Sequence, residues 1–577
     1  MNTCFKNIVR TLVSVFILTN IFITSGVIFK VEASQFMIDY KSEYIIDESG
    51  EANIIHNATI TNLQNDVIPM NYSLSAMDSN IYEVSAETNG KETEPKLNNN
   101  KNNTDITVTI KDYSIGEGRQ NTITIKYKSK SVAVKSGSIW NIYIPKIQIP
   151  DETTAYDVKL SVPESFGPKV FLTPEPTIEK KEDGKNIFYF TKNTFESTGI
   201  SAAFGGFQPV NFKIKYQIQN DSILPAIKKI AIPSDIEHYQ NVSYDKISPR
   251  PFKIEYDEDN NFVAYYILKP KQKTEIEVQG TSRILSKQIN VNSGGIISEI
   301  PKVLIKNYTR QQKYWETKSP YILKIARELK KDDQTVVYNA KMVYEFIKNN
   351  LKYDFDAQSK GMVERKGAEA AASQKNSWTC MEFTDLFIAV TRAMGIPARE
   401  INGYAFTSEE SNKPISISLE SGDTLHSWAE FYDPYNGWVQ VDPTWGTTSG
   451  LDYFSKLDTN HFAFVRKGIS SEHPFSAGTY RYSDNEKLIE TALSQTSSDE
   501  NFKPSVKANK VLNLNPLVIL SGKSRIKLEN TGKVTAYDIN GLNILPREKR
   551  YTNIKKENDR VVFKDFIGNE FETEIEK

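Results

Sequence analysis

The sequence predicts an α+β protein in which a helix-containing domain lies between β-rich domains. Residues 34–285 contain many short segments in which apolar and polar residues alternate, as in half-buried strands. Residues 301–395 instead place apolar residues at helical spacing. Strand-like segments then return and continue to the end of the chain, and no internal repeat is found.

The first 33 residues have the layout of a targeting segment. Basic residues precede a mostly apolar run at 12–29, and residues 31–33 offer a cleavage site with small residues. The run is long for a signal peptide and just long enough to span a bilayer. Residues 1–33 are therefore either a cleaved signal peptide or an N-terminal membrane anchor. Both alternatives predict a secreted or extracytoplasmic protein that meets the membrane only through this segment.

Length and charge limit the remaining possibilities. At 577 residues the chain is too long for one core, and its formal net charge of −1 argues against a nucleic-acid binder. No cluster has the spacing of a zinc site, and no acidic run has the EF-hand pattern. We therefore expect no metal and no cofactor. The oligomeric state is not indicated.

Changes in residue pattern divide the chain after residue 33 into five parts. In the first part, apolar and polar residues alternate within the segments 106–110 and 123–127. The glycine-rich stretch 115–118 between them predicts a hairpin turn. Many such strands indicate a β-sandwich. The expected parts are a β-sandwich domain (34–218), a smaller β-rich domain (219–300), a helix-containing domain (301–485), a linker (486–510) and a C-terminal β-rich domain (511–577).

Three amphipathic helices are expected in the domain 301–485. The first begins at Ser319-Pro320, a capping residue followed by a proline suited to the first helical position. The second starts near Val336 and ends near Asn350. The third begins at or just before Cys380, and Gly395 ends it.

Cys380 is the most informative residue of the chain. The only other cysteine, Cys4, lies in the targeting segment, so an exported protein has no internal disulfide partner for Cys380. At a helix N-terminus, free N–H groups and the helix dipole favour a thiolate and can stabilise an oxyanion. A buried core cysteine is the alternative, and the position of Cys380 outside the apolar stripe argues against it.

A predicted hairpin supplies a base for that thiol. Strand-like segments flank a turn at 433–437. If Tyr432 pairs with Trp438, His426 becomes the diagonal neighbour of Asp442 on one side of the sheet, roughly 7–8 Å away, and a two-residue shift would place them opposite each other at roughly 5 Å. Either register lets a carboxylate orient the imidazole. Spacing alone does not show that the hairpin packs on the Cys380 helix.

Several motifs in this order resemble the transglutaminase-like superfamily. They are Trp378-Thr379-Cys380-Met381-Glu382-Phe383, Arg392-Ala393-Met394-Gly395-Ile396-Pro397-Ala398-Arg399, Asn402-Gly403-Tyr404, His426-Ser427-Trp428-Ala429-Glu430 and Val441-Asp442-Pro443-Thr444-Trp445. The resemblance covers roughly residues 300–480. It implies a papain-like triad of Cys380 as nucleophile, His426 as base and Asp442 as orienting group, on a helix packed against an antiparallel sheet.

The resemblance implies an exported cysteine enzyme acting on amide bonds of a protein or peptide substrate at or outside the cell surface. A thioester acyl-enzyme would pass its acyl group to an amine or to water. Thr379 and Met381 stand where animal crosslinking members have Gln and Trp, which puts crosslinking specificity in doubt. A cysteine peptidase is the alternative enzyme, and a non-catalytic surface-binding module is the alternative of another class.

The remaining candidate residues have less specific signals. Trp378 and Trp445 are candidates for the acyl or oxyanion site, although core packing explains them equally well. Glu382 either interacts with Cys380 or is solvated, and Arg399 is interpreted as a structural ion-pair residue. His461 follows a predicted loop and is interpreted as a surface or packing residue, with lining of the cleft as the alternative.

Overall fold

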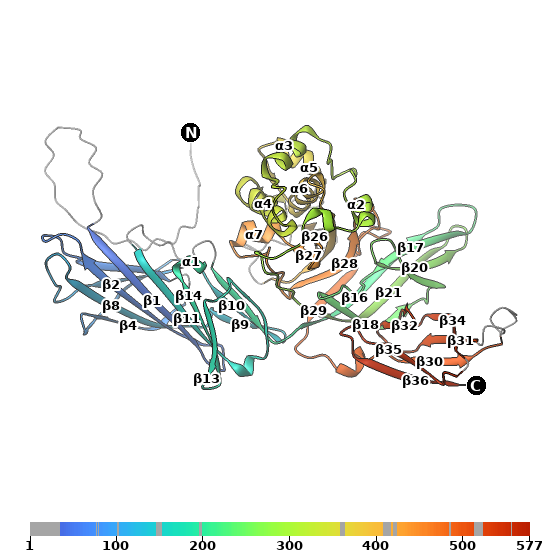
Figure 1. Cartoon of the computed structure of the whole chain (residues 1–577), viewed down its shortest axis with the longest axis horizontal. Helices are drawn as coiled ribbons and strands as arrows, with labels where there is room; N and C mark the ends of the chain where they lie inside the picture. The colour runs from blue at the N-terminus through green and yellow to red at the C-terminus, as the bar shows by residue number, and fades with distance from the viewer. Residues whose placement is uncertain are drawn as a thin grey trace. The chain divides into compact units, whose positions relative to one another are not determined.

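The computed structural model describes residues 35–576, except 77, 79, 101–102, 146–152, 196–198, 358–363, 408–416, 419–423, 484–485, 513–522 and 556. The predicted targeting segment lies outside these residues. Across the part of the chain that is described, no helix combines the length and apolar character needed to cross a membrane. The chain divides into two compact units, Met1–Gly206 and Phe207–Lys577, which are described in turn (Figure 1).

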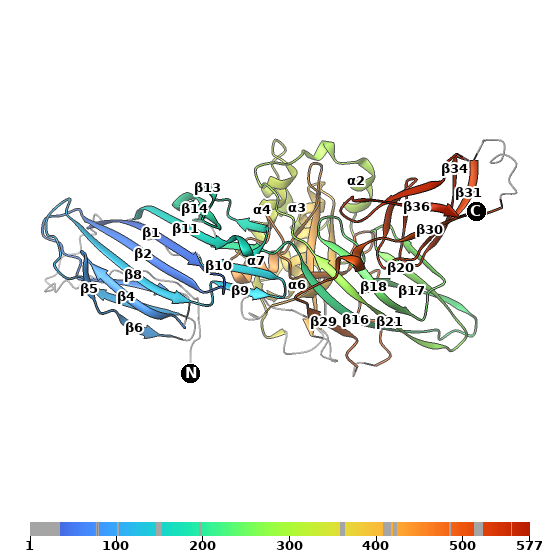
Figure 2. The same cartoon turned by 90° about the horizontal axis from the view of Figure 1, so that it is seen from below.

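The first unit is built from strands in three sheets around a shared hydrophobic core. The larger sheet runs β13 (Ile178–Glu182), β14 (Lys185–Thr191), β11 (Thr153–Pro163), β1 (Phe36–Ile46), β2 (Ala52–Asn62), β8 (Gln120–Ser129), β4 (Tyr82–Thr88), β5 (Lys91–Thr93). The two smaller sheets run β12 (Lys169–Thr173), β15 (Ile200–Phe204), β10 (Ile139–Ile144), β9 (Ala133–Ser136), and β3 (Asn71–Ala76), β7 (Thr104–Thr109), β6 (Lys96–Asn99). Figure 2 shows the long strands of this unit side by side.

The predicted hairpin in this unit is wrong, although both of its strands exist. β7 pairs with β3 and β6, whereas β8 pairs with β2 and β4, so residues 115–118 connect two different sheets. The alternating pattern fixes which side chains of a strand are buried, but it does not name the strand's partner.

The second unit begins with two antiparallel sheets and ends with a mixed one. The first two run β18 (Gln240–Ser248), β21 (Lys273–Ile284), β16 (Gln208–Gln219), β29 (Ile489–Leu493), and β17 (Ala226–Ile232), β20 (Phe262–Leu268), β19 (Lys253–Tyr256). The C-terminal sheet runs β33 (Leu542–Ile544), β32 (Ala536–Ile539), β35 (Arg560–Lys564), β36 (Glu570–Glu576), β30 (Val506–Lys510), β31 (Lys523–Asn530), β34 (Lys549–Lys555).

These pairings move the first predicted boundary. The first compact unit ends at Gly206, earlier than the predicted residue 218, because β16 pairs along its whole length with β21. The predicted linker 486–510 contains β29, which pairs with β16 from the other end of the unit. The local sequence of a strand does not show that it joins a sheet formed by residues far away in the chain.

In the part of the chain that is described, the helix-containing domain combines six helices with an antiparallel sheet. The helices are α2 (Lys302–Tyr308), α3 (Pro320–Leu329), α4 (Val336–Asn350), α5 (Ala368–Ser373), α6 (Cys380–Ala393) and α7 (Pro443–Ser449). The sheet runs β25 (Ile417–Ser418), β26 (Thr424–Asp433), β24 (Ala398–Ala405), β28 (His461–Lys467), and β27 (Gly437–Val441) pairs with β26. The three predicted helices are confirmed as α3, α4 and α6, and the fold is α+β.

The remaining short elements complete the chain. They are η1 (Glu164–Phe166), α1 (Lys192–Phe195), η2 (Ile297–Glu299), η4 (Asp499–Phe502), and the paired strands β22 (Lys352–Tyr353) and β23 (Ser377–Trp378).

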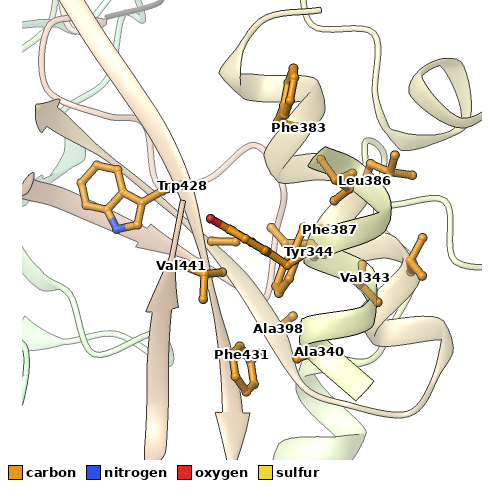
Figure 3. Close-up of a cluster of buried hydrophobic side chains, with 14 of the residues drawn as sticks. Ala340, Val343, Tyr344, Phe383, Leu386, Phe387, Ala398, Trp428, Phe431 and Val441 are labelled. Carbon is orange, nitrogen blue, oxygen red and sulfur yellow. The ribbon is translucent and has the colours of Figure 1, made fainter. Parts of the chain in front are cut away.

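Helix α6 is held against the sheet by apolar side chains that it shares with α4 and β26. Leu386 and Phe387 of α6 lie in one core with Tyr344 of α4 and with Trp428 and Phe431 of β26, and all five are buried (Figure 3). The centroids of the Phe387 and Phe431 rings are 6.3 Å apart. This core supplies the docking of helix on hairpin that sequence spacing alone did not show.

We expect the N-cap of α4 to contribute measurably to stability. The Thr335 hydroxyl accepts a hydrogen bond from the Tyr338 backbone N–H at 3.1 Å. Thr335→Ala should lower the free energy of unfolding by about 1 kcal/mol, because an N–H of the first turn loses its partner. Thr335→Ser should keep the bond. Urea denaturation of the two variants tests this, and equal losses in both would contradict a capping role.

Candidate active site

Cys380 is the first residue of α6, and a capping box fixes the start of the helix. The Glu382 carboxylate accepts hydrogen bonds from the Thr379 backbone N–H at 3.2 Å and from the Thr379 hydroxyl at 2.8 Å, and its other oxygen accepts the Lys366 N–H at 2.9 Å. The predicted helix start is therefore confirmed. Glu382 is buried and organises the turn that carries the cysteine.

The thiol itself is fully buried and is not in a disulfide. We took its position outside the apolar stripe as an argument against burial, and that inference is wrong. The helices α3, α4 and α5 and the strand β26 all pack on α6, so almost every residue of the helix is buried. An amphipathic pattern describes one face of a helix, whereas this helix is enclosed on several faces.

The hairpin brings His426 and Asp442 together in the register considered from the sequence. Tyr432 pairs with Trp438, and the Asp433 carboxylate accepts turn hydrogen bonds from the Tyr435 and Asn436 amides. His426 Nε2 lies 2.9 Å from Asp442 Oδ2, and both side chains are fully buried. The predicted imidazole–carboxylate pair is therefore present in the structure.

The hydrogen bonding of the other nitrogen of His426, Nδ1, differs from that of Nε2. Among the described residues, no nitrogen or oxygen hydrogen-bonds Nδ1, although this atom is buried. The Cys380 thiol is one of the groups that favour the charged form of the ring. Asp442 thus contacts one ring nitrogen of His426, and Cys380 interacts with the same ring.

Asp442 has a second role that the sequence interpretation missed. Its Oδ1 accepts hydrogen bonds from the backbone N–H groups of Thr444 at 2.8 Å and Trp445 at 3.1 Å, so it is the N-cap of α7. Asp442 is fully buried, and α7 begins at the next residue.

A second histidine completes the site. His461 Nε2 lies 3.4 Å from Asp442 Oδ2, and His461 Nδ1 lies 2.7 Å from Asp458 Oδ1. The rings of His426 and His461 have centroids 5.6 Å apart, and His461 is buried. His461 is therefore not a surface residue, and its burial against the Trp445 ring agrees with the packing interpretation. Only the pairing of β28 with β24 brings it to Asp442, and no sequence spacing signals that pairing.

The two tryptophan candidates lie in the hydrophobic core. Trp445 is fully buried, and its ring centroid lies 5.4 Å from that of His426 and 4.6 Å from that of His461. Trp378 lies on β23, next to α6, and is also buried. Trp445 therefore holds the two imidazoles in place by packing.

Arg399 is confirmed as a structural ion-pair residue. Its guanidinium forms a buried salt bridge with Glu430 on the neighbouring strand, and Asp259 Oδ1 lies 3.8 Å from Nη1 of Arg399. The guanidinium also stacks on the Trp438 ring at 4.0 Å from the centroid. These contacts lie near the turn end of the hairpin, away from His426.

Charge interactions set the protonation of the paired groups. Burial alone would lower the pKa of His426, but the charge and hydrogen bond of Asp442, followed by the thiol of Cys380, outweigh it and raise this pKa to about 9. Burial would raise the pKa of Asp442, but the charge of His426 and the hydrogen bonds from His426 and His461 lower it to about 2. An imidazolium facing an ionised carboxylate is the favoured state.

These shifts predict a pH dependence of stability. The pKa of His461 is also raised to about 9, because Asp458 and Asp442 outweigh its burial. Both histidines bind protons more tightly in the folded protein, so their stabilisation is complete below about pH 6.5 and is lost as the pH rises through about 9. The free energy of unfolding should fall across this range by up to about 1.4 kcal/mol per pH unit for each histidine. Denaturation series at several pH values test this, and a flat profile between pH 6.5 and 9 would contradict it.

Two other features bear on what the site can hold. The facing atoms of His426, Asp442 and His461 lie within 4.8 Å of one another, which is close enough for three groups to reach one ion. The hydrogen bonds among them explain this proximity, and we assign no metal there.

A cavity of about 800 Å³ lies at the turn end of the hairpin and is lined by Arg399 and Arg466 among others, but none of the three predicted catalytic residues lines it.

Comparison with known proteins agrees with this geometry. Residues 323–443, which include Cys380, His426 and Asp442, match the model of the transglutaminase-like superfamily. The chain therefore carries a transglutaminase-like domain, with β-rich domains on either side.

Two curated proteins share part of the sequence. The uncharacterized protein YebA of Bacillus subtilis (strain 168) is 24% identical over 365 residues, which are 56% of this chain and 46% of that protein. A protein-glutamine gamma-glutamyltransferase of Pseudomonas aeruginosa is 36% identical over 66 residues, which are 11% of this chain and 10% of that protein. The chain thus spans less than half the length of each of these relatives.

Among solved structures, similarity is found to a chain from Cytophaga hutchinsonii that is provisionally assigned as a cysteine protease. The two share 16% sequence identity with a TM-score of 0.29, and the match covers 50% of this chain and 98% of that one.

Proposed function

We propose that this protein is an exported cysteine enzyme that acts on amide bonds of protein or peptide substrates through a thioester on Cys380. The observation that carries the proposal is the hydrogen bonding of the two ring nitrogens of His426. Asp442 contacts Nε2, while Nδ1 is buried and has no hydrogen-bonding nitrogen or oxygen among the described residues, and the Cys380 thiol is one of the groups that raise the pKa of the ring. This is the arrangement required of an oriented base beside a nucleophile.

The first half of the reaction forms the acyl-enzyme. The thiol proton lies on His426 Nδ1, and the Cys380 thiolate attacks the carbonyl carbon of the substrate amide, which forms a C–S bond and an oxyanion. N–H groups at the start of α6 stabilise that oxyanion. The C–N bond then breaks, and Nδ1 gives its proton to the departing nitrogen. The products are a thioester, a free amine or ammonia, and a neutral imidazole.

The second half releases the acyl group. An incoming amine or water bonds to the thioester carbon while its proton passes to Nδ1 of His426. The C–S bond breaks and the thiolate–imidazolium pair is restored. An amine acceptor yields a new amide, whereas water yields a carboxylic acid, so the same residues support transfer and hydrolysis.

The side-chain amide of glutamine is the acyl donor that we favour. Support comes from the relative named protein-glutamine gamma-glutamyltransferase, although it matches over 66 residues only. Incubation with a glutamine-containing protein and a labelled primary amine separates the alternatives. Labelled protein indicates transfer, release of ammonia alone indicates hydrolysis, and cleaved backbone indicates the alternative cysteine peptidase.

The thiol should depend on His426 for its reactivity. Cys380 in the wild type should react with iodoacetamide near neutral pH at least ten times faster than in His426→Ala, because the imidazolium stabilises the thiolate. His473→Ala, a change of the same type at an exposed position, is the matched control. Peptide mass spectrometry after timed quenching measures the rates. Equal rates in wild type and His426→Ala would leave the site without a thiolate–imidazolium pair and would favour a non-catalytic binding module.

We extend the proposal to the place of action. The layout of residues 1–33 supports export, and a cysteine without an internal disulfide partner is then available for chemistry. Fractionation of the native host with N-terminal sequencing tests this. A protein outside the cytoplasm that begins near Ser34 indicates cleavage, one that retains its N-terminus in the membrane indicates an anchor, and a cytoplasmic protein would refute export.

A further inference from the structure

The site holds a buried chain of polar groups that extends beyond the three predicted catalytic residues. It runs from Cys380 through His426, Asp442 and His461 to Asp458, and the Tyr453 hydroxyl donates a hydrogen bond to Asp458 Oδ2 at 2.9 Å. All six side chains are buried. The reaction proposed above uses only the first three, so His461 and its partner carboxylate are unexplained.

The partners of His461 fix its protonation. Asp442 Oδ1 accepts hydrogen bonds from two backbone N–H groups, and Nε2 of both His426 and His461 lies within hydrogen-bond distance of Oδ2. Asp458 likewise accepts from the Asn460 N–H at 2.9 Å and from the Tyr453 hydroxyl. Hydrogen-bond donors thus surround both carboxylates, which favours the ionised form of each. Because each ring nitrogen of His461 faces one of them, both nitrogens must carry a proton.

We propose that His461 is an imidazolium at neutral pH and a positioning residue, which clamps Asp442 and lowers the proton affinity of His426. The inference rests on the proposed function and deepens it. With Asp442 alone, His426 would hold its proton more tightly. A fixed cation on the same carboxylate oxygen shares the negative charge, so His426 gives its proton more readily to the departing nitrogen and is then the base of the second half of the reaction.

The groups around His461 favour this assignment. The charged or titratable groups that face the Asp442–His461–Asp458 cluster are His426 from β26, Tyr453 and Lys456 from the loop after α7, and Tyr344 from α4. The remaining neighbours of His461 are the Trp428 and Trp445 rings, with centroids 5.0 Å and 4.6 Å away. The two carboxylates are the only groups within hydrogen-bond distance of His461 that are recorded among the described residues.

The size of the effect follows from the separation of the rings. At 5.6 Å between centroids, a unit charge in a protein interior shifts the titration of its neighbour by about one to two pH units. Removal of the His461 charge should therefore raise the titration midpoint of His426 by about that amount.

Nitrogen-15 NMR of histidine-labelled full-length protein is the test. The chain has five histidines, so the imidazole signals can be assigned by substitution. In the wild type and in Cys380→Ala, both ring nitrogens of His461 should carry protons up to at least pH 8. In His461→Gln, the midpoint of His426 should move upward by about one to two units. His473→Gln, an exposed position, is the matched control and should leave it unchanged.

A double variant distinguishes the effect of the His461 charge from loss of the fold. His461→Gln leaves Asp442 and Asp458 without their shared cation, whereas Asp458→Asn combined with His461→Gln keeps the net charge of the site. The double variant should show a smaller shift of His426 in the same direction. A neutral His461 ring at pH 7 in the wild type, or an unchanged His426 midpoint in both variants, would overturn the inference. Either result would leave the alkylation test of Cys380 and His426, and hence the proposed function, unaffected.

Discussion

Asp442→Asn should reduce turnover by about 10⁴-fold while α7 keeps its cap. In a serine protease, the same exchange of the orienting aspartate costs about this factor. The reason here is the tautomer. An asparagine amide that donates to His426 Nε2 would place the ring proton on Nδ1, which is the nitrogen that must accept the thiol proton. Asparagine caps a helix as well as aspartate does, so the hydrogen bonds to Thr444 and Trp445 can persist.

Single-turnover acylation and thermal melting, measured on the same preparations, separate chemistry from folding. Asp433→Asn is the matched control, because Asp433 is also fully buried and accepts turn amides of the same hairpin, but has no recorded histidine contact. Asp442→Asn should lower the melting temperature as well, since two buried imidazoles lose their carboxylate. If it acylates at the wild-type rate, Asp442 is a capping residue only.

Glu430→Ala should destabilise the second unit by about 3–5 kcal/mol. Glu430 and Arg399 are both buried and form a salt bridge, and Asp259 is 3.8 Å from the guanidinium. Glu430→Ala removes the nearer of two carboxylates from a buried guanidinium, which accounts for a loss of this size. Arg399 also stacks on Trp438, so the guanidinium cannot turn to solvent without breaking that contact.

Denaturation followed by tryptophan fluorescence measures this loss, since five of the six tryptophans lie in the second unit: Trp315, Trp378, Trp428, Trp438 and Trp445. Lys246→Ala is the control, because its salt bridge with Glu277 belongs to the same unit but has an exposed lysine. A loss in Glu430→Ala no greater than in this control would show that the buried pair contributes nothing.

The sequence predicts the elements of the site better than their surroundings. The start of α6 at Cys380, the end of α4 at Asn350 and the pairing of Tyr432 with Trp438 are all local features, and the structure confirms them. Capping residues, turn residues and apolar periodicity lie within a few positions of one another, so they can be found without knowledge of the fold.

Features that depend on packing between distant segments were missed. The burial of Cys380 requires α3, α4 and α5 around α6, and the role of His461 requires β28 to lie beside β24. The same limit explains the wrong hairpin at residues 115–118, where two correct strands belong to different sheets. The sequence shows which face of an element is apolar, but not which elements cover it.

Intact-mass spectrometry during turnover tests the central claim most directly. The protein is incubated with a glutamine-containing peptide and quenched in acid within seconds, which preserves thioesters. Wild type should gain the mass of the peptide less ammonia, and digestion should locate the adduct on Cys380. His426→Ala and Cys380→Ser should show no such thioester. An adduct at another residue, or turnover of the peptide by Cys380→Ser, would contradict the assignment of Cys380 as the nucleophile.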